Sequence, residues 1–182
     1  SFRAGPGAIE HVRRHGLAPA DIACIPAAAG GPKGLALLPF DRLFCREWLQ
    51  APGLSIELMG ASVGAWRMAA LAQPDPIAAL DRLQHAYVRD QNYAERPGPR
   101  DVAEAVTRIA RAVLDGKPLE VRDGVALTII TSRARGPLHG RESKLAFARA
   151  TLSNALSRER LAAYLERVLF VAGRPGFLAQ SF

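Results

Sequence analysis

Short apolar runs alternate with stretches of helical periodicity along the first half of the chain. The runs 22–26 and 54–59 have the composition of buried strands. Each is followed by a turn of small residues and then by a helical stretch, over 34–50 after the first run and 65–72 after the second. Repeated strand–turn–helix units are typical of α/β proteins. We therefore expect an α/β fold with a mainly parallel sheet that helices cover on both faces.

The remaining pattern predicts further helices and a hairpin. Caps and apolar spacing place helices over 6–15, 77–89, 101–116, 141–156 and 158–165, with a loop over 92–100. Asp123-Gly124 readily supplies the positive φ angles of a tight turn, which predicts a hairpin over 121–125 with a returning strand over 126–131. A last apolar run covers 168–172.

The turn after the second strand reads Gly-Ala-Ser-Val-Gly and has Ser62 at its centre. This is the G-x-S-x-G pattern of a nucleophile elbow, a sharp strand-to-helix turn that holds a serine hydroxyl exposed. Gly60 and Gly64 are the small residues that let the backbone turn so tightly. Ser62 is therefore the candidate nucleophile, and the pattern favours acyl transfer.

The turn after the first strand, residues 28–34, is a glycine loop. Acyl transfer passes through an oxyanion that backbone N–H groups must stabilise, and Gly30 and Gly31 can present such groups because no Cβ blocks their approach. Lys33 is expected either to support the loop or to meet an anionic headgroup. A nucleotide-binding P-loop is disfavoured, because Lys33 is followed by Gly34 and not by Ser or Thr.

Together the two motifs resemble the front half of a patatin-like phospholipase, whose pattern is D-G-G-G-x-R/K-G followed by G-x-S-x-G. Ser62 follows Gly34 by 28 residues. The resemblance implies a three-layer α/β/α fold and hydrolysis of lipid acyl esters by a Ser-Asp dyad without metal or cofactor. It makes Ser62 the nucleophile, Gly30 and Gly31 the oxyanion-hole region, and Lys33 the basic residue of the loop.

The chain departs from the family pattern in two places. Ala28 and Ala29 stand where the family has Asp and its first Gly. The family's later D-G-G or D-G-A is also missing, since Asp115-Gly116 and Asp123-Gly124 lack the third residue and fit a helix end and a turn. We therefore expect one patatin-like domain over 1–182, incomplete at its C-terminus, with the aspartate in a further segment and little activity in this piece alone.

Two alternatives stay open. The first is a non-catalytic module of the same fold that binds lipid or a partner protein. The second is an α/β-hydrolase triad, because Ser62, Asp123 and His139 occur in the required order.

Composition narrows the choice of partners and compartment. The net charge of +7 favours anionic partners. Nearly all of the positive charge is arginine scattered along the chain, and the first interpretation of such a distribution is a solvated surface. Peripheral contact with an anionic membrane is the second interpretation, and nucleic acid is not expected as a partner. Cys24 and Cys45 have no C-x-x-C spacing, so neither a disulfide framework nor a zinc site is expected. His11 and His15 lack a third metal ligand in sequence. We expect a cytoplasmic protein, in peripheral contact with a membrane at most.

Overall fold

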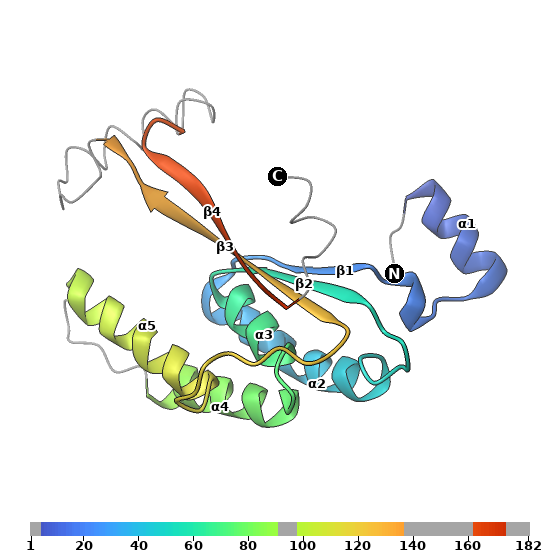
Figure 1. Ribbon diagram of the computed structural model, residues 1–182, viewed down its shortest axis with the longest axis horizontal. Coiled ribbons are helices and arrows are strands. Elements are labelled where there is room, and N and C mark those ends of the chain that lie inside the picture. Colours follow the sequence, from blue (N-terminus) through green and yellow to red (C-terminus); the bar gives the residue numbers. More distant parts are fainter. Residues whose placement is uncertain (1–4, 91–97, 137–161, 174–182) are drawn as a thin grey trace.

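A computed structural model describes residues 5–90, 98–136 and 162–173 (Figure 1). Its sheet has the order β1-β2-β3-β4, in which β1, β2 and β3 are parallel and β4 is antiparallel to β3. The strands are β1 (Cys24–Ala27), β2 (Ile56–Ala61), β3 (Val125–Ala134) and β4 (Leu165–Gly173). The prediction of an α/β fold with a mainly parallel sheet is confirmed.

The helices lie mainly on one side of this sheet. They are α1 (Pro6–His15), α2 (Leu38–Glu47), α3 (Val63–Leu71), α4 (Pro76–Arg89) and α5 (Pro99–Val113), with the 3₁₀ helices η1 (Pro19–Asp21) and η2 (Gly31–Leu37). Figure 1 shows α2, α3, α4 and α5 on the same face, whereas α1 stands apart at the end where the chain begins. The described residues thus form a sheet with one packed helical layer, and a second layer is not seen among them.

The core lies between β2, β3 and the helical layer. Ile56 and Leu58 alternate along β2 and face the helices, together with Leu127 of β3. Helix α3 is buried nearly all round because the sheet lies on one side of it and α4 on the other. The elbow motif therefore joins the two most buried elements of the fold.

Two expected elements are wrong. Residues 121–125 do turn, with Gly124 at φ 76°, but β3 pairs with β2 and β4 and not with a strand before the turn. A positive-φ turn shows where the chain bends and not which strands it joins. The helix over 158–165 is also wrong where it is described, because 162–164 form a turn and Leu165 begins β4.

Other boundaries shift by a few residues. The stretch expected as one helix over 34–50 divides into η2 and α2. Helix α5 begins at Pro99, two residues before the predicted start. Asp101 is the third residue of this helix, and its carboxylate caps the helix by accepting a hydrogen bond from the Gly98 N–H at 2.7 Å. The predicted helix over 141–156 and most of the loop over 92–100 lie outside the described residues. Within the described ranges, no helix is both long and apolar enough to cross a membrane.

Candidate active site at the serine elbow

Ser62 lies between the end of β2 and the start of α3, in a strained backbone conformation. Its φ is 54° and its ψ −128°, and it is exposed. Only one other non-glycine residue of the described ranges, Asp115, has a positive φ. Such a conformation costs about 1–3 kcal/mol and persists only where the surroundings enforce it. The sharp turn that a nucleophile elbow requires is therefore present at Ser62.

Gly60 and Gly64 enforce this turn, because neither position has room for a side chain. A Cβ on Gly60 would lie 2.5 Å from the Gly64 carbonyl oxygen. A Cβ on Gly64 would lie 2.2 Å from the Ala27 carbonyl oxygen, at the end of β1. The two glycines thus let α3 begin directly against the ends of both strands.

The glycine loop lies beside the elbow. Ala27 of β1 is paired with Gly60 of β2, so the turns after both strands leave the same edge of the sheet. A Cβ on Gly34 would lie 2.5 Å from Val63 Cγ1, which places η2 in contact with the residue after Ser62. Gly31 opens η2 at φ 54°, a left-handed conformation that favours glycine. The structure therefore brings together the two motifs that the sequence separates.

The N–H of Val63 is a backbone donor at the start of the helix that follows the elbow. Helix α3 begins at Val63, and an N–H in the first turn of a helix has no partner within that helix. The N–H after the nucleophile is a standard oxyanion donor of an elbow, so the position itself was the available signal. Gly30 is exposed and Gly31 half-buried on the neighbouring loop, which leaves that backbone accessible too.

Lys33 does not hold the loop through any described residue. Its side chain is exposed, and it forms no hydrogen bond or ion pair within the described ranges. One of its two expected roles, support of the glycine loop, would require a partner side chain or carbonyl, and none is found in this part of the chain.

A buried ion pair, missed by the sequence reasoning, joins the helices that follow the two motifs. Arg67 Nε donates to Asp41 Oδ2 and Arg67 Nη2 to Asp41 Oδ1, both at 2.6 Å. The two side chains are 7% and 4% exposed. This bidentate pair ties α2 to α3 and so fixes η2 relative to the elbow. The sequence signal was a lone charge inside the apolar stretch of α3.

Asp123 lies at the wrong end of the sheet to act on Ser62. It precedes Gly124, whose carbonyl accepts a hydrogen bond from the Ile56 N–H at the start of β2. Ser62 follows the other end of that strand, about 20 Å away at 3.3 Å per residue. The alternative triad of Ser62, Asp123 and His139 is therefore contradicted at Asp123, and His139 lies outside the described residues. A cavity of about 900 Å³ opens at the Asp123 end, away from the elbow.

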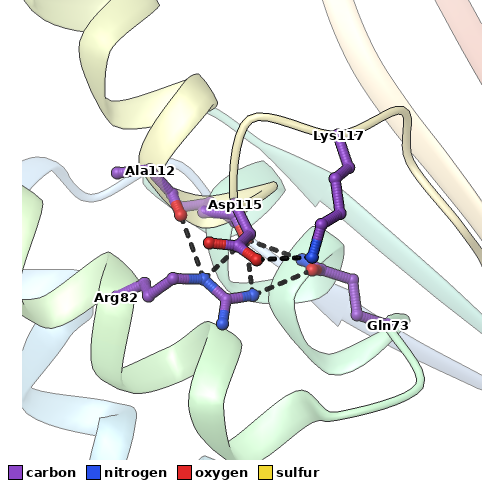
Figure 2. A network of polar contacts seen from close by, with 6 residues as sticks. Gln73, Arg82, Ala112, Asp115 and Lys117 are labelled. Atoms are coloured by element: carbon purple, nitrogen blue, oxygen red, sulfur yellow. Dashed lines mark hydrogen bonds and ion pairs between the residues drawn. The ribbon is translucent and has the colours of Figure 1, made fainter.

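Asp115 belongs to a polar network at the end of α5 (Figure 2). Lys117 Nζ lies 2.7 Å from Asp115 Oδ2, and this hydrogen bond, with the charges of Lys117 and Arg82, lowers the pKa of the Asp115 carboxyl. Arg82 donates to the Ala112 carbonyl at 3.0 Å and to Gln73 Oε1 at 3.2 Å. Asp115 thus terminates a helix, as its Asp-Gly sequence indicated, and it faces Lys117 rather than Ser62.

The site thus combines an exposed, strained serine with backbone donors on two adjacent turns, an arrangement suited to nucleophilic attack on a carbonyl. Comparison with protein-family models, with curated proteins and with solved structures finds no match. What this site does is therefore inferred from its own geometry and chemistry.

Proposed function

We propose that this chain is the elbow-bearing part of a serine acyl hydrolase of the patatin-like, three-layer α/β/α type, acting on lipid or other acyl esters. The observation that carries the proposal is the conformation of Ser62, which is exposed at φ 54° with the glycine loop in contact with its neighbour Val63. Strain of this kind is retained at functional sites. The Ser62 backbone begins α3, but the Ser62 hydroxyl forms no hydrogen bond within the described residues, so the side chain has no capping role there.

In the proposed reaction, Ser62 Oγ attacks the ester carbonyl as a carboxylate takes its proton. The developing oxyanion is held by the N–H groups of Val63 and of Gly30 or Gly31. Each such donor contributes about 3–4 kcal/mol to transition-state stabilisation in other enzymes. The intermediate then collapses: the ester C–O bond breaks, and the alcohol leaves with the proton that the carboxylate had taken. Water next attacks the acyl-serine as the carboxylate takes a proton from it, and the acid is released as that proton returns to Ser62 Oγ.

The carboxylate is proposed to come from a further segment of the protein. Asp115 and Asp123 are placed away from Ser62 by the helix end and the turn to which they belong. A chain without that segment is expected to retain the elbow geometry but to turn over esters slowly or not at all.

A fluorophosphonate probe tests the proposal, because it phosphonylates only a serine that is activated. The full-length protein is incubated with the probe and digested, and mass spectrometry locates the adduct. We expect the adduct on Ser62 and none in the Ser62→Ala variant. Ser55 is a matched control, because it is an exposed serine at the other end of β2. A folded full-length sample without an adduct on Ser62 would refute the hydrolase.

A non-catalytic lipid- or protein-binding module is the second candidate. It is favoured by one observation: within the described residues, no carboxylate is hydrogen-bonded to the Ser62 hydroxyl. For such a module, vesicles co-sediment equally with wild type and Ser62→Ala, and neither protein turns over an ester. Turnover by wild type that Ser62→Ala abolishes would reject the module.

A further inference from the structure

Arg67 is the one charged residue of α3. The rest of this helix is uncharged and mostly buried. Apolar side chains would be enough to pack such a helix, and the replacement of a buried ion pair by apolar residues is often neutral or stabilising. Stability alone therefore does not explain why a buried Asp41–Arg67 pair stands between α2 and α3.

The pair contributes direction, which apolar packing does not. Both carboxylate oxygens of Asp41 accept from Arg67, Oδ2 from Nε and Oδ1 from Nη2, each at 2.6 Å. A bidentate contact of this kind fixes a distance and an angle together. Among the described residues, no other hydrogen bond or ion pair joins α2 to α3. The orientation of α2 against α3 is therefore set by this contact.

The pair lies close along the chain to both motifs of the candidate site. Arg67 follows Ser62 by five residues, about 7.5 Å along a helix. Asp41 lies in the first turn of α2, and η2 runs into α2 without a linker. The contact of Gly34 with Val63 is apolar and does not by itself fix an orientation. A shift of α2 would therefore carry η2 and the glycine loop with it.

We infer that Asp41 and Arg67 are positioning residues of the Ser62 site. Through η2, their contact holds the N–H groups of Gly30 and Gly31 where they meet the oxyanion that forms on attack by Ser62. The inference rests on the proposed function, because an oxyanion forms only if Ser62 attacks a carbonyl. A displacement of about 1 Å at such a site slows a reaction about a hundredfold. The pair is thus expected to matter more for reactivity than for stability.

The experiment compares the rate of fluorophosphonate attachment with stability in the full-length protein. Asp41→Leu combined with Arg67→Met removes both charges, and this double variant is expected to fold while the maximal rate of Ser62 phosphonylation falls about tenfold or more. Arg67→Lys keeps the charge but loses the planar fork, so a similar loss is expected, and it tests the inference if the double variant does not fold. Arg42→Met is the matched control, because Arg42 joins the same helix to Asp81 of α4 at 2.7 Å. It is expected to react as wild type does.

An NMR measurement reports the positioning without catalysis. The amide signals of Gly30 and Gly31 are expected to shift in the double variant and to stay in place in Arg42→Met. Gly53, in the turn before the start of β2, is the internal reference and should not shift. The inference is overturned if the folded variants that lack the bidentate contact react at the wild-type rate, or if the signals of Gly30 and Gly31 do not move. A wild type without an adduct on Ser62 would instead reject the hydrolase, and the amide shifts would still show whether the pair positions the loop.

Discussion

Ser62 has a backbone conformation that glycine adopts more readily than serine. A substitution by glycine therefore measures the strain at this residue. We expect Ser62→Gly to raise the free energy of unfolding by about 1 kcal/mol, because the relief of strain exceeds the added freedom of the unfolded chain. Ser62→Ala keeps the Cβ and should leave stability near that of wild type. Urea denaturation measures both. A Ser62→Gly variant less stable than Ser62→Ala would show that the turn is not strained.

Gly64 is the position where a single methyl group should be most damaging. A Cβ there would lie 2.2 Å from the Ala27 carbonyl oxygen, which is backbone and cannot rotate away. We expect Gly64→Ala to cost about 3 kcal/mol or more in unfolding free energy. Gly7→Ala is the control, since nothing lies within 4 Å of a Cβ at Gly7. Equal stability of the two variants would contradict this packing.

Lys117 should control the titration of Asp115. Its hydrogen bond is the main cause of the lowered pKa of the Asp115 carboxyl, so Lys117→Met is expected to raise that pKa toward its ordinary value. A lowered pKa in the folded state stabilises the protein above the unfolded pKa, and the stabilisation is lost as the pH falls through the folded pKa. NMR titration of the carboxyl carbon measures the change. Lys33→Met should leave it unmoved.

The residues of the elbow were predictable because each satisfies a local requirement. Gly60 and Gly64 are needed where two backbones meet, and Ser62 stands between them. The apolar neighbours of Arg67 in α3 indicate a buried charge, but its pairing with Asp41 was not predictable, because the two side chains are 26 residues apart and nothing local indicates their approach. Local geometry is encoded in short patterns, whereas a buried contact between helices depends on how the helices pack.

At the scale of elements, the Asp41–Arg67 pair should decide how firmly α2 is held to α3. Arg67→Met leaves the Asp41 carboxylate buried and unpaired, and we expect a loss of about 3–5 kcal/mol in unfolding free energy. Asp41→Leu combined with Arg67→Met removes both charges and should recover most of it. Thermal and urea unfolding measure the two variants. A double variant as unstable as Arg67→Met would mean that the loss comes from packing rather than from the orphaned charge.

The elements themselves were predictable to different degrees. The first two strands were found within two residues, because apolar runs followed by small residues mark buried parallel strands. The hairpin over 121–125 was wrong, because pairing partners far along the chain determine what β3 joins. The final strand, β4, was expected only as an apolar run, since such a run is compatible with either helix or strand.

For the whole molecule, stability should depend on the packed layers and not on α1. The core runs from the helical layer into β2 and β3, and α1 contributes no buried residue to it. His11 Nε2 of α1 lies 2.9 Å from Asp21 Oδ1 in the segment that follows, and both side chains are partly exposed. An exposed pair of this kind adds about 1 kcal/mol at most.

Removal of the residues up to Gly16 should therefore change the unfolding free energy by no more than about 1 kcal/mol. Leu58→Ala is the contrasting control: Leu58 is fully buried in β2, and its truncation should cost about 2–5 kcal/mol. Denaturant unfolding of the shortened chain and of the variant gives both values. A shortened chain as unstable as Leu58→Ala would place α1 within the cooperative unit. Since α1 lies away from the elbow, the fluorophosphonate adduct on Ser62 should survive the truncation unchanged.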